Sequence, residues 1–346
     1  MSVVARGPDS RAIVLPDPRG PWTEELFTAL MNAPGHVPVP VTTQAADPLA
    51  DDDEQLALYI CYELHYAQIA GVDERWEWDP ALLAFRAVLE ERLEGALLEL
   101  TPEQPAAGAQ LVGDALQQIV AEDDGPPLSR YVESRASREE MLEHVMHRSA
   151  YQLKEADPHS WAIPRLAAGP KAALLEVQFD EYGGGHAERM HSVLFANTMS
   201  ALGLDPSYGA YVEVLPGITL ASVNMLSLFG LHRRRRGALV GHLAAFEMTS
   251  SIPNRRYGNA LRRLGYGADA TRFYDEHVEA DAVHENIAAW DLAGGLARAE
   301  PELAEDILFG ARALLALEAR WADHLLDAWR DGRTSLLRAV VDSPAG

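Results

Sequence analysis

The sequence lacks features on which several classes of protein depend. Its single cysteine, Cys61, excludes an intramolecular disulfide framework and any zinc site with two or more cysteine ligands. Lys and Arg number 29 against 52 Asp and Glu, a net charge of −23, so the basic surplus of a nucleic-acid or membrane-surface protein is missing. No apolar run is long enough to span a membrane, and residues 1–20 lack the apolar core that a signal peptide would have. We therefore expect a cytoplasmic protein without nucleic-acid or membrane partners.

Hydrophobic residues make up 48% of the chain, which is enough for a buried core. Their spacing is helical almost throughout, and only 209–215 resembles a strand. The sequence predicts an all-α fold, with helices long enough for a bundle. The expected parts are a loose N-terminal extension at 1–50, an N-terminal helical region that could dimerise at 51–130, a helical-bundle core at 131–335 and a C-terminal tail at 336–346.

Helix starts and stops are visible along the chain. Ser137 and Glu140 match a capping box, and the helix they start should run to about Ala156, where Asp157 and Pro158 stop it. A further helix start is expected at 101–103, and breaks at 123–127 and 253–254. Helices are expected at 22–31, 51–69, 80–98, 137–156, 171–202, 219–231, 237–249, 268–298 and 303–329.

Three possible metal ligands stand at helical spacing near residue 280. His277, Asp281 and His284 stand at i, i+4 and i+7, so they lie within about 60° of one another on one helix face. Two imidazoles and a carboxylate in this arrangement suit a first-row metal ion. The alternative is a solvated polar stripe that happens to contain histidines.

A second segment, 174–191, is also rich in possible ligands. Glycines 183–185 interrupt it, and each would cost about 1 kcal/mol relative to alanine inside a helix. The segment therefore predicts either a deformed helix or a close approach to the backbone, the alternative being an ordinary loop between two short helices. The candidate side chains are Glu176, Asp180, Glu181, His186, Glu188 and His191.

Two other carboxylates, Glu155 and Glu247, lie in apolar sequence. An acid on an apolar helix face is costly unless it is paired or binds a metal. The alternatives are an exposed position or a salt bridge to an arginine of 233–236 or 255–256. Together with the two richer segments, these acids suggest a dinuclear iron or manganese site with mainly oxygen ligands.

The acid-x-x-His spacing leaves a second, ferritin-like assignment open. It pairs Glu188 with His191 and Asp281 with His284. The two assignments differ over Glu181 against Glu188, and over whether His277 is a ligand. They share His191, Glu247, Asp281 and His284.

Three motifs resemble those of the haem-oxygenase-like diiron oxidases, also called iron-containing redox enzymes. They are Leu-Lys-Glu-Ala-Asp-Pro-His at 153–159, Asp-Glu-Tyr-Gly-Gly-Gly at 180–185, and His277-x3-Asp281-x2-His284. The resemblance covers about residues 135 to 330 and is greatest to the N-oxygenating branch, typified by the central domain of the enzyme that forms the N-nitrosourea of streptozotocin. It implies a haem-oxygenase-like helical bundle and the metal ligands Glu155, Glu181, His191, Glu247, His277, Asp281 and His284.

The resemblance also implies a function. Two iron ions would activate O2 with electrons from an external, unidentified donor, and the enzyme would N-oxygenate a small amine, guanidine or amino-acid-derived substrate in biosynthesis. Glu247 would be the carboxylate associated with N-oxygenation, and the N-terminal helices would pair two subunits in a homodimer. His186 and Glu188 would lie outside the ligand set, with His147 and Glu176 as spare candidates. The 16 residues after Arg330 leave no room for the cupin domain of the streptozotocin enzyme, so N–N bond formation by that route is not expected.

Three other functions fit the sequence. One is a diiron oxidase that desaturates or cleaves an aliphatic amino or fatty acid. Another is a ferritin-like iron-binding protein without an organic substrate, and the third is a helical interaction protein with a degenerate metal site. In an enzyme, Arg189, Arg255 or Arg256 could pair with a substrate carboxylate, although each also fits a surface charge.

Overall fold

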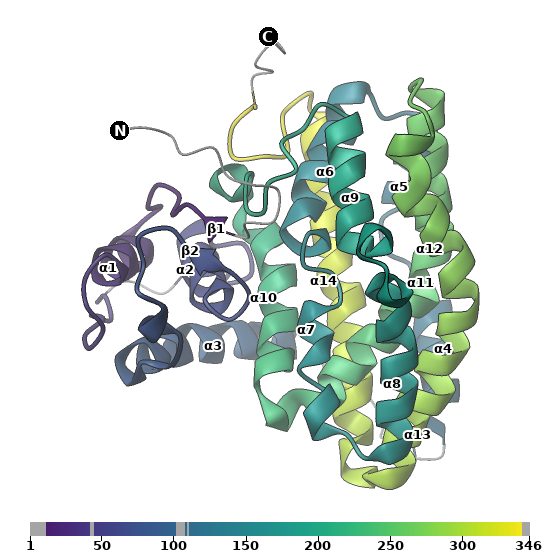
Figure 1. Cartoon of the computed structure of the whole chain (residues 1–346), viewed down its shortest axis with the longest axis horizontal. Helices are drawn as coiled ribbons and strands as arrows, with labels where there is room; N and C mark the ends of the chain where they lie inside the picture. The colour runs from purple at the N-terminus through teal and green to yellow at the C-terminus, as the bar shows by residue number, and fades with distance from the viewer. Residues whose placement is uncertain (1–11, 42–44, 102–107, 109–110, 341–346) are drawn as a thin grey trace.

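Long amphipathic helices pack around α11 (Arg236–Arg263), which has α12 (Ala268–Asn286) on one side and α14 (Ala304–Arg330) on the other (Figure 1). The computed structural model describes residues 12–41, 45–101, 108 and 111–340, with residues 279–283 described by their backbone alone. Around these three helices lie α5 (Leu128–Ser134), α6 (Arg138–Gln152), α7 (Asp157–Ser160), α8 (Ala168–Glu181), α9 (His191–Ala201), α10 (Gly217–Leu231) and α13 (Gly294–Ala299). The expected all-α helical bundle is confirmed.

Two glycines allow α11 and α14 to approach closely. A Cβ atom on Gly241 would lie 1.7 Å from the carbonyl oxygen of Ile307, and one on Gly310 would lie 2.0 Å from that of Ala238. Because neither position has room for a side chain, the two helix backbones can pack in direct contact. This contact fixes α11, which carries Glu247, within the bundle.

The N-terminal helices pack on the outside of the bundle. Here α2 (Asp52–Glu63) contacts α10, and α1 (Pro21–Leu30) and α3 (Pro80–Leu100) contact α2 (Figure 1). The side chain of Asp51 caps α2 by accepting from the amides of Asp53 and Glu54. Another helix, α4 (Val112–Ala121), contacts α14. The expected extra helical region before the bundle is therefore present, whereas the division into domains stays a prediction.

Four expected helices differ from the prediction, two in their C-terminal ends and two by an interruption. The helix predicted over 51–69 ends at Glu63, and Ile69 lies in the two-residue strand β2 (Gln68–Ile69), which pairs in parallel with β1 (Ala12–Ile13). The helix expected at 171–202 is divided into α8 and α9 by the short 3-10 turns η4 (Gly183–Gly185) and η5 (Ala187–Arg189). The helix expected at 268–298 contains a π-helical segment, η8 (Ile287–Ala293). The helix that starts at Ser137 ends at Gln152, one turn before Ala156.

One other expectation was wrong. The predicted break at 253–254 is absent, because α11 continues through Pro253. An internal proline costs about 3 kcal/mol, and the packing of α11 on both α12 and α14 outweighs this cost. The strand-like segment 209–215 contains the 3-10 turn η6 (Val212–Val214) instead. The helix start expected at 101–103 falls largely on residues outside the described ones.

Shorter 3-10 turns connect the remaining elements. They are η1 (Glu74–Trp78), η3 (Ile163–Arg165), η7 (Arg233–Arg235) and η9 (Pro301–Leu303).

Within the described part of the chain, no helix combines the length and the apolar character needed to cross a membrane.

Candidate metal centre

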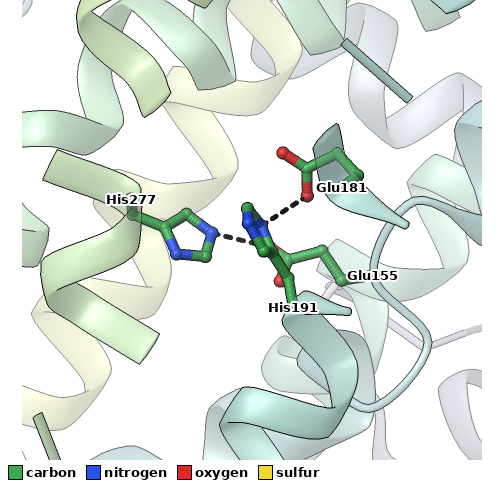
Figure 2. Close-up of side chains that lie close together, drawn as sticks. All are labelled: Glu155, Glu181, His191 and His277. Carbon is green, nitrogen blue, oxygen red and sulfur yellow. Dashed lines mark ion pairs between the residues drawn. The ribbon is translucent and has the colours of Figure 1, made fainter. Parts of the chain in front are cut away.

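Six of the seven predicted ligands come together in the interior of the bundle. They come from four helices and from the turn after α6, and all six are at most 7% exposed. Figure 2 shows four of them converging. The six are Glu155, Glu181, His191, Glu247, His277 and His284.

The six residues form two groups that share Glu181. In the first group, Glu155, Glu181, His191 and His277 each offer a ligand atom within 4.8 Å of the others. In the second group, Glu181, Glu247 and His284 do the same. If each group held a metal ion, Glu181 would contribute a ligand to both.

Individual distances show how the imidazoles face the carboxylates. Nδ1 of His191 lies 2.8 Å from Oε2 of Glu181, and Nε2 of His277 lies 3.5 Å from Oε1 of Glu155 (Figure 2). Nδ1 of His284 lies 3.5 Å from Oε2 of Glu247. The neighbour of Glu247 is therefore an imidazole on α12 and not one of the arginines that the sequence suggested.

Glu155 reaches the centre because the chain leaves helical geometry just after α6. Ala156 has a φ of 74°, the one positive value found at a non-glycine residue in the described part of the chain. The side-chain amide of Gln178 donates to the Ala156 carbonyl at 2.9 Å, and Lys154 is bound to Glu63 of α2 in a buried ion pair. These contacts stabilise the strained backbone of this turn, a conformation that residues within a continuous α-helix do not adopt.

The three glycines bring Glu181 and His191 together. Glu181 ends α8 and His191 begins α9, and all three intervening glycines have positive φ values, between 61° and 85°. At Gly183 a Cβ atom would lie 2.6 Å from the amide nitrogen of Met190. The turn is thus packed tightly enough to place the two ligands beside each other.

Burial dominates the electrostatics of the cluster. It raises the pKa of Glu155 and of Glu247, because a charged carboxylate is disfavoured away from water, although nearby imidazoles partly oppose the shift. Burial also disfavours the charged form of His284, but Glu247, Asp180 and Glu181 outweigh it and raise its pKa to about 9. A proton and a metal ion therefore compete for the same group of side chains.

Neighbouring groups orient the ligands. Nδ1 of His277 lies 2.8 Å from the carbonyl oxygen of Phe273, which can only accept, so the proton is on Nδ1 and Nε2 is left for a metal. With its nitrogen toward Glu155, the Gln152 carboxamide donates to both carboxylate oxygens at 2.6 and 3.1 Å. Oδ2 of Asp180 lies 3.0 Å from Nε2 of His284 and fixes that ring in the same way. No sequence pattern indicated the roles of Gln152 and Phe273.

The donor set fits a pair of divalent metal ions. Three carboxylates that face imidazoles carry up to three negative charges in a buried site, and such charge must be compensated by protons or by bound cations. Mixed carboxylate and imidazole donors suit iron or manganese. Asp281, the seventh predicted ligand, lies on α12 between His277 and His284, but its side chain is outside the described residues.

Other candidates lie outside the cluster. Glu188 and His186 have side chains 76% and 63% exposed, and Glu176 is also exposed. His147 is buried elsewhere, with its two ring nitrogens 2.7 Å from Oγ1 of Thr219 and 3.0 Å from Oγ of Ser335. The geometry thus brings Glu181 rather than Glu188 to the other ligands, and it includes His277.

The candidate substrate arginines have other partners or lie near the surface. Arg189 is bound to Glu276 at 3.3 Å, Arg255 is exposed, and Arg256 donates to Ser129 at 3.0 Å. The arginines 234–236, among those considered as partners of Glu247, form ion pairs with Glu94, Asp306 and Glu300 instead.

A cavity of about 430 Å³ opens beside the metal centre. His277 and Gln152 line it, as do residues of α5, α6, α11, α12 and α14. This volume lies within the range of small-molecule sites. A small substrate can therefore be accommodated next to one of the predicted ligands.

Comparison with known proteins identifies the family. The model of the iron-containing redox enzyme family matches residues 142–319. Nitrosourea synthase of Streptomyces achromogenes subsp. streptozoticus is 26% identical over 136 residues, which cover 39% of this chain and 29% of that protein. A CADD-like protein of unknown function from Nostoc punctiforme has a solved structure with 18% identity and a TM-score of 0.49, covering 63% of this chain and 97% of that one. The family model spans just over half of the chain and all six clustered side chains, so the protein belongs to the iron-containing redox enzyme family.

Proposed function

We propose that this protein is a non-haem diiron oxidase that uses O2 to N-oxygenate a small amine, guanidine or amino-acid-derived substrate. The observation that carries the proposal is the pair of buried ligand groups joined by Glu181. The similarity to nitrosourea synthase supports nitrogen as the atom that is oxidised. When bound, two iron ions would supply the redox chemistry that activates O2.

The side chains of this protein would hold the metal pair and orient the substrate. Glu155, His191 and His277 would bind one ion, Glu247 and His284 the other, and Glu181 both. We propose Asp281 as a further ligand because the sequence places it between two histidines of the same helix face. Conversion of an amine to a hydroxylamine uses one O2, two electrons and two protons and releases one water, so an external reductant is required.

Metal loading is the primary test. Anaerobic titration with Fe(II) followed by metal analysis should give about two irons per wild-type chain. The double variant His277→Ala/His284→Ala should lose most of this iron, whereas His186→Ala, which removes an exposed imidazole, should retain it. The proposal fails if wild type binds no more iron than the double variant.

A second comparison separates the two ligand assignments. Glu181→Ala should lower iron binding because it removes the shared carboxylate, while Glu188→Ala should leave it unchanged because that side chain is exposed. The reverse result would favour the ferritin-like assignment. Exposure of the loaded protein to O2 with candidate amines and a reductant should then yield N-hydroxylated products, detected by mass spectrometry. Desaturated or shortened carbon chains would instead indicate the alternative oxidase chemistry.

We also propose that the N-terminal helices pair two subunits in a homodimer. Sedimentation equilibrium of the full chain tests this, with a mass of one 37.9 kDa chain as the contradicting result.

A further inference from the structure

Three side chains on one face of α6 line the cavity at successive turns. His144, Arg148 and Gln152 stand at i, i+4 and i+8, and all three line the same space. Gln152 contacts the predicted ligand Glu155, so this row leads away from the metal centre. At 1.5 Å per residue, His144 lies about 12 Å along the helix axis from Gln152.

The charge in the middle of the row is already neutralised. Arg148 donates to both carboxylate oxygens of Glu318, at 2.9 and 2.5 Å, and its guanidinium lies 4.0 Å from the ring of Trp321. A bidentate pair of this kind uses the guanidinium charge and its orientation together. This part of the cavity therefore favours an uncharged group over a free carboxylate.

His144 is buried in the wall of the cavity and lacks a hydrogen-bond partner. It is 1% exposed, and among the described residues neither of its ring nitrogens makes a hydrogen bond. The hydroxyl of Tyr274, which also lines the cavity, is likewise without a partner there. Unpaired buried polar groups are costly, so two of them on residues that line one cavity point to a ligand that satisfies both.

The protonation state of His144 defines the group it can accept. Burial, assisted by the charge of Arg148, holds the pKa of His144 well below its usual range, so the imidazole is neutral. A neutral imidazole has one donor and one acceptor nitrogen. Its ring packs against Tyr257, with centroids 4.4 Å apart, and Trp321 lies on the same wall. Aromatic surfaces of this kind favour a flat, apolar body.

We propose that this cavity binds an elongated amine whose nitrogen lies at the metal centre, whose flat apolar body lies along α6, and whose far end carries an uncharged donor–acceptor group, such as a carboxamide, bound by His144 and Tyr274. Only the placement of the ligand's nitrogen at the metal centre rests on the proposed function. The far end is argued from the two unpartnered polar groups and the neutralised Arg148. It makes His144 a specificity-determining residue.

Three matched probes test the far end. They are 4-(aminomethyl)benzamide, 4-methylbenzylamine and 4-(aminomethyl)benzoate, and binding to the Fe(II)-loaded full chain is measured calorimetrically without O2. The benzamide should bind at least tenfold more tightly than the methyl compound, because it satisfies His144 and Tyr274. The benzoate should bind more weakly than the benzamide, because Arg148 is already paired with Glu318.

Two variants assign the preference to named side chains. His144→Phe keeps an aromatic ring against Tyr257 and should abolish the preference for the benzamide while changing the affinity for 4-methylbenzylamine less than twofold. Tyr274→Phe removes a single hydroxyl and should reduce the preference several-fold, and it carries the test if the His144 variant does not fold. Iron content and circular dichroism provide the fold controls.

Equal affinities of wild type for the benzamide and the methyl compound, including no measurable binding of either, would overturn the proposal. So would a preference that persists in both variants, which would mean that these groups are satisfied by bound water. The proposed function is judged separately by product analysis. If the calorimetric pattern is found but no N-oxygenated product forms, the proposed function fails and the binding assignment stands.

Discussion

Lys154 and Glu63 form an ion pair in which neither side chain is exposed to solvent. Glu63 ends α2, and Lys154 directly precedes the predicted ligand Glu155. The hydroxyl of Tyr208 donates to Glu63 at 2.6 Å, and the Lys154 ammonium lies 4.3 Å from the ring of Tyr66. The pair thus links the N-terminal helices to the turn that carries a predicted ligand of the candidate metal centre.

Removal of one partner of this pair should be strongly destabilising. Glu63→Gln leaves a buried lysine cation without its carboxylate, so we expect the free energy of unfolding to fall by about 3 to 5 kcal/mol. The double variant Glu63→Gln/Lys154→Met has no unpaired charge and should recover most of this loss. Urea unfolding of wild type and the variants measures both values. Equal losses in the single and double variants would contradict a stabilising role for the charge pair.

Gly183 should be far more sensitive to substitution than Gly185. Both have positive φ values, so alanine costs about 1 to 2 kcal/mol of backbone strain at either position. At Gly183 the new Cβ would also collide with the backbone at Met190, whereas at Gly185 it would meet no atom within 4 Å. Gly183→Ala should therefore lower both stability and iron content, and Gly185→Ala stability alone. Similar iron contents in the two variants would argue against a positioning role for this turn.

Asp281 should contribute to metal binding if the ligand pattern expected from the sequence holds. Asp281→Asn keeps the size of the side chain but removes its charge, and we expect a reduced iron content and at least a tenfold weaker Fe(II) affinity in anaerobic titrations. Glu285→Gln removes an exposed acid from the same helix and serves as the matched control. Wild-type iron content and affinity in Asp281→Asn would remove this residue from the ligand set.

Buried neutral histidines should make the protein sensitive to acid. His159 and His242 are in contact, with Nε2 and Nδ1 3.2 Å apart, and burial lowers the pKa of His242 to about 3 and that of His159 well below its usual value. Below pH 6.5 the unfolded chain takes up protons that these folded side chains do not, so stability falls as the pH drops.

At pH 5 each such histidine should cost about 2 kcal/mol of unfolding free energy relative to neutral pH. Denaturant unfolding of metal-free protein between pH 5 and 7.5 measures the slope. His242→Gln removes one titrating group and should reduce the loss of unfolding free energy at pH 5 by about 2 kcal/mol. Above pH 7, the pH dependence of the unfolding free energy should change little. A parallel pH dependence of wild type and variant would contradict this origin of the acid sensitivity.

Much of the fold is encoded locally and could be predicted. The periodicity of 304–330 follows one amphipathic helix, and the Ser137 and Glu140 capping box starts α6 as expected. The ends of helices could not be predicted when distant partners set them. The helix end at Gln152 depends on the ion pair between Lys154 and Glu63, which lies 91 positions earlier in the sequence. The continuity of α11 through Pro253 depends on the helices that pack on both sides of it.

Helical spacing alone places His277 and His284 on one helix face, whereas the full set of candidate ligands was implied by the family resemblance. The family resemblance already favours Glu181 over Glu188, but the proximity of Glu181 to the other candidate ligands and the pairing of Glu247 with His284 are set by tertiary structure. Only the folded chain shows that Gly183–Gly185 turn back so that Glu181 meets His191 while Glu188 points into solvent. The physical reason is that sequence periodicity reports only the direction of a side chain within one helix. The distance between candidate ligands on different helices depends on the turns that connect these helices, on their packing and on the burial of charge between them.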